Sequence, residues 1–341
     1  MAKESSQKSG VQDLPRIRLI VARGTLPSRG KDRLDLTNYA RSGRPRMTGQ
    51  ELLAEIPEVA QFARVEADVD MPSDLRTLEQ MRAVAVRINE LIKSPDLDGV
   101  VLVQGTSTLE ETAYFLTLTV HSSKPVVVTG AQRPITALSS DAALNLLNAI
   151  RTAAHPETHG KGVVVVANDE INSAREVTKT QTYRLQTFRS RDIGLLGYTD
   201  ADRIVYYRSP TRRHTVDSEF FLDKVERLPH VAILYVYSGS QPGLANAAIE
   251  LGARGLVVAG TGPGSLNELD QEFTAIADAR RAVVVRSSRV GEGRVIRYST
   301  HQKPCMVASD NLLPQKAAVL LSLALCQTSD PEEIQRVFDE Y

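Results

Sequence analysis

The stretch that decides the fold reads Asp98-Gly-Val-Val-Leu-Val-Gln-Gly-Thr-Ser-Thr-Leu-Glu-Glu-Thr-Ala113. It opens with a continuous apolar run, mostly of β-branched residues, which is typical of a strand buried on both faces. Gly105 ends the run, hydroxyl residues occupy the next three positions, and a helix-like segment begins with Glu110. A buried strand that turns sharply into a helix places hydroxyl groups beside backbone N–H groups, as nucleophiles and oxyanion sites require.

Similar strands and helices alternate through the rest of the N-terminal half. The sequence predicts strands over 17–22, 99–103, 125–129 and 162–167, and helices over 74–92, 109–119 and 140–153. Continuous apolar strands separated by helices favour a parallel sheet that is covered on both faces. We therefore expect a doubly wound α/β domain.

A polar, basic segment interrupts this alternation. Arg208-Ser-Pro-Thr-Arg-Arg-His-Thr215 has no apolar periodicity and is interpreted as a solvated linker. Beyond it, strands are predicted over 231–237, 255–259 and 282–286, and helices over 245–252, 272–280, 315–327 and 330–341. We therefore expect a disordered tail (1–15), an N-terminal domain (16–207), a linker (208–228) and a smaller C-terminal α/β domain (229–341).

Composition excludes several classes of function. The chain has 41 basic and 41 acidic residues, and this balance argues against a nucleic-acid or membrane-surface partner. The first residues are polar and lack the apolar core of a signal peptide, so we expect a cytoplasmic protein. Cys305 and Cys326 give neither a disulfide framework nor a metal site, and no cofactor is expected.

Reactive side chains are expected beyond the carboxyl ends of the strands, where open parallel sheets bind ligands. The segments that follow the predicted strands include 23–26, 104–107, 130–134 and 168–170, and 177–180 lies downstream of the last. Thr25 and Thr106 each come one residue after a glycine at a strand end. A threonine hydroxyl needs a base, and a desolvated lysine such as Lys179 is a candidate, because burial depresses its pKa.

These motifs resemble the bacterial-type L-asparaginase and glutaminase-asparaginase family over nearly the whole chain. The strongest local matches are Gly105-Thr-Ser-Thr-Leu-Glu-Glu-Thr-Ala-Tyr-Phe-Leu116, Val177-Thr-Lys-Thr180, Arg286-Ser-Ser-Arg289 and Pro314-Gln-Lys-Ala317. The resemblance implies an N-terminal catalytic domain, a smaller C-terminal domain and a small-molecule substrate. It also implies a homotetramer of intimate dimers, in which a neighbour's C-terminal domain completes each active site.

The resemblance also implies roles for the reactive residues. Thr25 matches the family's nucleophilic threonine, and Tyr39 resembles the mobile-loop tyrosine that assists it. Thr106 matches the second threonine, which is associated with water activation, and Lys179 matches the lysine that is hydrogen-bonded to it.

The residues that hold the substrate in the family differ here. Arg23 replaces a glycine before the nucleophile, and Ser107 replaces an aspartate that pairs with the lysine and binds the substrate's α-ammonium. Asp68 and Val69 align with a Ser-Gln or Ser-Glu pair, and Gly239 aligns with an asparagine from the neighbouring subunit. Asp68 could accept an ammonium, and Arg23 either receives a carboxylate or is a surface or interface arginine.

Three hypotheses of function follow. The first is an asparaginase-like amidohydrolase with a threonine nucleophile, altered specificity and weak or no activity on free L-asparagine, in which Lys179 acts as a neutral base beside Ser107. The second is a non-hydrolytic enzyme of a specialised pathway that performs proton transfer, cyclisation, dehydration or isomerisation. The third is a ligand-binding protein without catalysis, in which Ser107 only fills space.

Overall fold

The larger sheet is built from short valine-rich strands. The computed structural model describes residues 14–69, 71, 74–297 and 305–341. Five strands are parallel in the spatial order β2-β1-β3-β4-β5, namely β1 (Arg16–Val21), β2 (Arg64–Ala67), β3 (Gly99–Val103), β4 (Val126–Thr129) and β5 (Val163–Ala167). Three antiparallel strands, β6 (Glu170–Ser173), β9 (Gly197–Thr199) and β10 (Ile204–Tyr206), extend the sheet beyond β5. The sheet is therefore mixed, and the wholly parallel sheet expected from the sequence is corrected.

Alternating side chains of each central strand enter two separate cores. On β3, Val100 and Leu102 pack with α2 (Leu78–Ile92) and α3 (Leu109–Thr119). Val101 and Val103 pack on the opposite face with α1 (Gly49–Ala54) and α4 (Ala142–Ala153). Both faces of the strand are thus apolar, which is why its sequence runs without polar interruption.

Two helices begin a few residues later than the sequence predicts, and a capping box sets the start of one of them. Thr77 accepts a hydrogen bond from the Gln80 backbone and Gln80 bonds back, so α2 begins at Leu78 instead of the expected 74. The expected helix over 140–153 begins at Ala142, after Asp141.

The smaller sheet carries four parallel strands in chain order. They are β11 (Val231–Tyr235), β12 (Gly255–Gly260), β13 (Val283–Ser288) and β14 (Met306–Ala308). Helices α5 (Leu244–Glu250), α6 (Asp270–Asp278), α7 (Pro314–Ala324) and α8 (Pro331–Glu340) accompany it. The remaining elements are a two-stranded hairpin, β7 (Thr178–Lys179) with β8 (Phe188–Arg189), and six 3-10 turns at 39–41, 57–61, 156–158, 215–217, 222–224 and 267–269.

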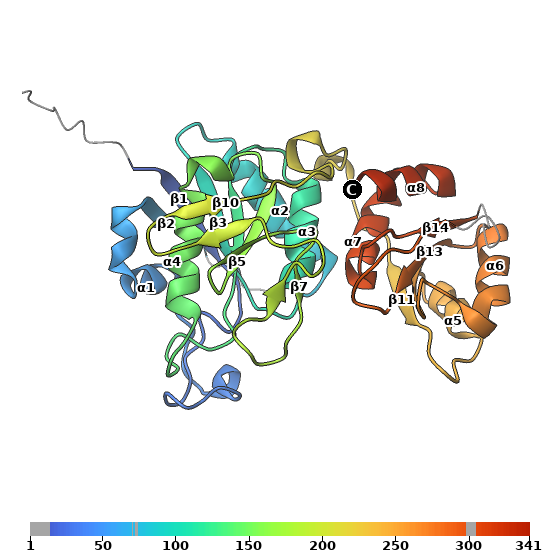
Figure 1. Cartoon of the computed structure of the whole chain (residues 1–341), viewed down its shortest axis with the longest axis horizontal. Coiled ribbons are helices and arrows are strands. Elements are labelled where there is room, and N and C mark those ends of the chain that lie inside the picture. The colour runs from blue at the N-terminus through green and yellow to red at the C-terminus, as the bar shows by residue number, and fades with distance from the viewer. Residues whose placement is uncertain (1–13, 70, 72–73, 298–304) are drawn as a thin grey trace, which may run out of the picture.

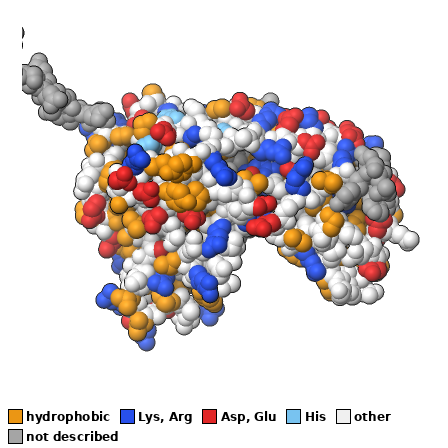
Figure 2. All heavy atoms as spheres, viewed as in Figure 1, with side chains coloured by type: hydrophobic (Ala, Val, Ile, Leu, Met, Phe, Trp, Pro, Cys, Tyr) orange, Lys and Arg blue, Asp and Glu red, His pale blue; other side chains and the backbone are white. Residues whose placement is uncertain are grey.

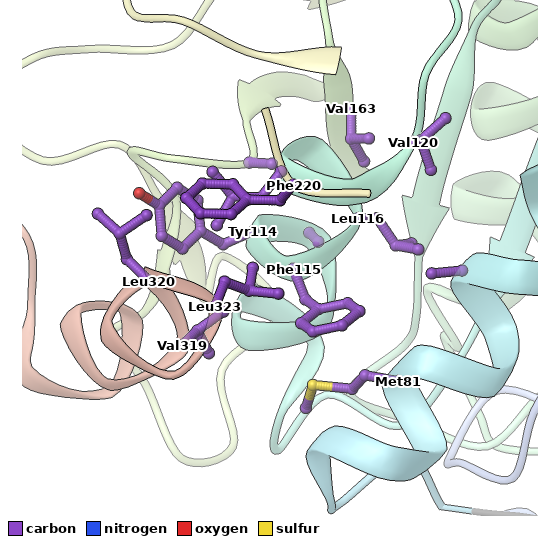
Figure 3. Packing of buried hydrophobic residues seen from close by; sticks show 14 of the residues in the cluster. Met81, Tyr114, Phe115, Leu116, Val120, Val163, Phe220, Val319, Leu320 and Leu323 are labelled. Carbon is purple, nitrogen blue, oxygen red and sulfur yellow. The ribbon is translucent and has the colours of Figure 1, made fainter. Parts of the chain in front are cut away.

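Helix α7 joins the two lobes seen in Figure 1. One side of it packs on β11, β12 and β13, and the other packs on α3. Figure 3 shows Val319, Leu320 and Leu323 of α7 facing Tyr114 and Phe115 of α3. The lobes therefore share one hydrophobic core.

The basic segment between the lobes makes specific contacts that its composition did not predict. Arg212 pairs with Asp310 at 2.7 Å, and Arg213 pairs with Glu340 at 2.7 Å. Phe220, a few residues further on, is buried in the shared core. These ion pairs and contacts dock the segment against the C-terminal lobe and the end of the chain.

Charges of both signs are interspersed on the face drawn in Figure 2. This distribution agrees with the formal net charge of zero and shows no basic stripe on that face. Among the described residues, no helix has both the length and the apolar character needed to cross a membrane.

Candidate functional site

A cavity of about 340 Å³ opens where β1, β3 and β4 end and hairpin β7–β8 approaches. Six of the predicted site residues contribute to its wall. The lining includes Arg23, Gly24, Thr25, Tyr39, Thr106, Ser107 and Lys179, together with Gln132, Arg46, Asp74 and Arg76. The structure thus brings together residues that lie up to about 150 positions apart, at the sheet edge where open α/β folds bind ligands.

Two glycines let the loops after β1 and β3 touch. The Gly105 N–H donates to the Arg23 carbonyl at 3.1 Å. A Cβ atom on Gly24 would lie 2.4 Å from the Gly105 nitrogen and 2.6 Å from its Cα, so only glycine fits at this position. This contact fixes Thr25 and Thr106 on the wall of the same cavity.

The Thr25 hydroxyl is paired with a phenol. Thr25 Oγ1 lies 2.8 Å from Tyr39 Oη, and either atom can donate. Thr25 is buried and Tyr39 is half-buried, so the pair sits at the border of cavity and protein interior. A phenol at this distance can take or return the proton of the threonine hydroxyl.

A second hydroxyl is paired with a lysine. Lys179 Nζ donates to Thr106 Oγ1 at 2.6 Å and to Gln132 Oε1 at 3.0 Å. Burial lowers the pKa of Lys179 below its ordinary value, while the carboxylate of Glu110 opposes that shift. The neutral form of the amine, which can accept a proton, is therefore favoured relative to an exposed lysine.

Glu110 and helix α7 position this lysine. One oxygen of the buried Glu110 carboxylate accepts the Lys179 backbone N–H at 2.7 Å. Its other oxygen accepts from Gln315 of α7, also at 2.7 Å. The C-terminal lobe thus holds the carboxylate that fixes the backbone of Lys179.

Gln132 is a site residue that the sequence reasoning did not select. Its amide oxygen faces Lys179, and its amide nitrogen donates to the Arg184 carbonyl in the β7–β8 hairpin at 3.1 Å. Asp141 accepts its backbone N–H at 2.9 Å. The available signal was its place in the segment after β4, since strand ends collect ligand-binding residues.

Three of the expected substrate-binding residues do not line the cavity. The Asp68 carboxylate accepts two hydrogen bonds from Arg87 of α2, at 2.7 and 2.8 Å, so it already has a cationic partner and its role as an ammonium acceptor stays a prediction. Val69 is 79% exposed and does not line the cavity. Gly239 lies beyond β11 in the C-terminal lobe, also away from this cavity.

Asp68→Asn tests whether the Asp68–Arg87 pair is structural. We expect it to lower the free energy of unfolding by about 1–2 kcal/mol at pH 7, because a charge-assisted, bidentate pair is lost. Hydrogen bonds from Arg87 hold the pKa of Asp68 below its ordinary value. The contribution is therefore present above the pKa of the unfolded carboxyl and is lost as pH falls through the folded pKa.

Urea titrations at a series of pH values measure this difference. The gap between wild type and Asp68→Asn should shrink below about pH 4, where the unfolded carboxyl titrates. Glu66→Gln is the matched control, because its carboxylate is 74% exposed where it meets Arg18 and should contribute little. A gap that persists unchanged in acid would show that the Asp68 charge is not involved.

The described residues hold no cluster of three or more His, Cys, Asp or Glu side chains that could bind a metal ion. Neither Cys305 nor Cys326 forms a disulfide.

Comparisons with known proteins agree over the full length. Residues 16–212 match the family described as "Asparaginase, N-terminal", and residues 230–338 match the "Glutaminase/Asparaginase C-terminal domain". The chain is 42% identical to "L-asparaginase 2" of Bacillus subtilis (strain 168) over 340 residues, covering 99% of this chain and 89% of that protein. It is 35% identical to the "Glutaminase-asparaginase" of Pseudomonas fluorescens biotype A, covering 100% and 93%.

A solved structure has the same fold. The crystal structure of a "Probable Cytoplasmic L-asparaginase" from Campylobacter jejuni superposes with a TM-score of 0.89 at 36% identity, covering 96% of this chain and 100% of that one. The α/β fold with two lobes that the sequence predicted is confirmed. Another relative is named "Probable L-asparaginase periplasmic" in Haemophilus influenzae, so the cytoplasmic location of this chain stays a prediction.

Proposed function

Because the chain belongs to the asparaginase family and is therefore a hydrolase of amide C–N bonds, we propose that it uses Thr25 as nucleophile. We further propose that its specificity has moved away from free L-asparagine. The observation that carries the proposal is the presence of two paired hydroxyls, Thr25–Tyr39 and Thr106–Lys179, on one cavity wall. Family membership favours this hypothesis over a non-hydrolytic enzyme and over a binding protein.

The first half-reaction forms an ester. Thr25 Oγ1 attacks the amide carbonyl carbon while Tyr39 takes the hydroxyl proton. The tetrahedral oxyanion is held by backbone N–H groups where β3 gives way to α3. The C–N bond then breaks, and the proton leaves on the nitrogen as ammonia.

The second half-reaction is hydrolysis of that ester. A water near Thr106 loses a proton toward Lys179, either directly or through the hydroxyl 2.6 Å away. The resulting hydroxide attacks the ester carbonyl, and Thr25 leaves with its proton restored. The depressed pKa of Lys179 supports this role, since only the neutral amine accepts a proton.

The altered specificity rests on the groups that face the substrate. Where the family has an aspartate, Ser107 offers only a hydroxyl. Asp68 is occupied by Arg87, and Val69 has no polar group. Loss of a charge-assisted partner costs about 2–5 kcal/mol, so free asparagine should be a weak substrate.

Ammonia release from a panel of amides tests the reaction class. We expect release of one ammonia per amide hydrolysed, with a product mass that has gained water and lost ammonia. Free L-asparagine should be turned over slowly. A product of unchanged mass would contradict hydrolysis.

Ser107→Asp separates the two functions of the residue that the family carries there. A carboxylate beside Lys179 stabilises its ammonium form and raises its pKa. Since kcat/KM falls as pH drops through the Lys179 pKa, that fall should move to higher pH by about one unit. The pH profile on whichever amide the wild type hydrolyses measures this shift.

The same variant should not restore strong asparaginase activity. Val69 and Gly239 still lack the polar groups of the family, and Asp68 stays paired with Arg87. Ser107→Ala is the matched control, because it changes the side chain without adding a charge. Efficient asparagine turnover by Ser107→Asp alone would overturn the proposed specificity.

We also propose that the chain assembles as a homotetramer in which a neighbour's C-terminal lobe closes the cavity. Side chains on and just after the edge strand β11 support this, because Tyr235 and Tyr237 are more than half exposed there. Gly239, two residues further on, has open space around its Cβ position. Light scattering of the purified protein measures the assembly, and a monomer would contradict it.

A further inference from the structure

The charges on the cavity wall point to a particular class of substrate. Among the described lining residues, Arg23, Arg46, Arg76 and Lys179 are basic, and Asp74 alone is acidic. Resting on the proposed amidohydrolase function, we infer that the substrate is a primary amide that carries a carboxylate and no charged nitrogen at its α-carbon. N-acylated asparagine and nitrogen-free monoamides of dicarboxylic acids are the members of this class.

Arg23 is placed to bind the carboxylate. Its backbone is pinned by the hydrogen bond from Gly105, and it stands two residues before Thr25. Its side chain is exposed at the cavity and forms no ion pair with any described residue. A guanidinium matches the two oxygens of a carboxylate in a bidentate fork, which a glycine at this position cannot provide.

Among the described residues of this wall, a substrate ammonium finds no carboxylate without a partner. Asp74 is paired with Arg76 at 3.4 Å. Glu110, which lies behind Lys179, is occupied by the Lys179 backbone and by Gln315. An ammonium would thus enter a field of like charge, whereas a carboxylate is attracted by it.

The uncharged partners of Lys179 also favour a substrate without an ammonium group. Lys179 donates to the amide oxygen of Gln132 and to the Thr106 hydroxyl, neither of which carries a charge. Neither of these two partners of Lys179 offers a substrate a negative group that could neutralise an ammonium. With Lys179 neutral and Asp74 paired with Arg76, the charges that favour an anion are those of Arg23 and Arg46.

Binding to the full-length Thr25→Ala variant tests the inference without turnover. Titration calorimetry would compare succinamate, N-acetyl-L-asparagine and L-asparagine at low salt. We expect at least one of the two ammonium-free amides to bind about tenfold or more tightly than L-asparagine. Its affinity should fall as salt is raised, because attraction to an exposed guanidinium is screened.

Arg23→Gln, added to the Thr25→Ala variant, tests whether Arg23 binds the carboxylate. It should weaken binding of the preferred amide by about tenfold to hundredfold. Arg44→Gln is the matched control, because Arg44 is exposed in the same N-terminal region and does not line the cavity. It should leave the dissociation constant within about twofold.

The outcomes separate this inference from the proposed reaction. The inference is supported if either ammonium-free amide binds more tightly than L-asparagine and if this preference is lost in Arg23→Gln. The relative affinities of N-acetyl-L-asparagine and succinamate then distinguish an acylated substrate from a nitrogen-free one. The inference is overturned if L-asparagine binds as tightly as both ammonium-free amides. It is also overturned if Arg23→Gln leaves the affinity for the preferred amide unchanged. Ammonia release by the wild type is scored separately, and its absence would refute the reaction without altering the binding result.

Discussion

Thr25→Ala should reduce kcat for amide hydrolysis by about a thousandfold or more, with a smaller change in KM. The hydroxyl is the group that forms the ester in the proposed reaction. Thr106 is held by Lys179 at 2.6 Å and belongs to the other pair. Steady-state ammonia release on the best amide of the panel measures the loss.

Tyr39→Phe is the matched control for this loss. It removes the hydroxyl 2.8 Å from Thr25 but leaves the threonine in place, so we expect a drop in kcat of about tenfold to hundredfold. In the wild type, ester formation should release ammonia in a burst equal to the enzyme concentration. This burst should disappear in Thr25→Ala. Undiminished turnover by Thr25→Ala would remove Thr25 from the role of nucleophile.

Gly24→Ala should lower the free energy of unfolding more than Asp68→Asn does. The added Cβ would lie 2.4 Å from the nitrogen and 2.6 Å from the Cα of Gly105, and 2.8 Å from the carbonyl carbon of Gln104. These are backbone atoms, which cannot rotate away as a side chain can. Separating the two loops costs about 3 kcal/mol or more of unfolding free energy. It also shifts Thr25 against Thr106, and a misplacement of about 1 Å can lower the rate about a hundredfold.

Urea unfolding and ammonia release on the same preparation measure both effects. Gly291→Ala is the matched control, because a Cβ there would meet only the end of the Arg191 side chain at 3.9 Å. That variant should change the unfolding free energy by less than about 0.5 kcal/mol. A Gly24→Ala protein as stable and active as the wild type would show that the loop contact is not needed.

Much of the fold could be predicted because the central strands are continuous apolar runs in the sequence. The run Gly99–Val103 is buried on both faces and was predicted with its observed limits. The antiparallel strands β6, β9 and β10 were missed, because Glu170–Ser173 and its partners are short and mix polar with apolar residues. Such strands are defined by their pairing with a neighbour, and no local pattern reveals that.

The candidate site was predicted where it follows a strand and missed where it depends on packing. Thr25 and Thr106 come directly after strand-ending glycines, so sequence position alone places them at the sheet edge. The pairing of Asp68 was not predicted, because its partner, Arg87, lies nineteen positions away on α2. Gln132 was passed over because its importance depends on the hairpin that brings Lys179 to it.

The bridge from Gln315 through Glu110 to Lys179 limits how this chain can be recombined. A hybrid that joined residues 16–212 to the C-terminal half of a distant relative would inherit a foreign α7. Unless that helix supplied an amide donor at the same place, a buried carboxylate would lose its ligand and the lysine its anchor. Successful shuffling between relatives should therefore exchange α3 and α7 as one inherited block.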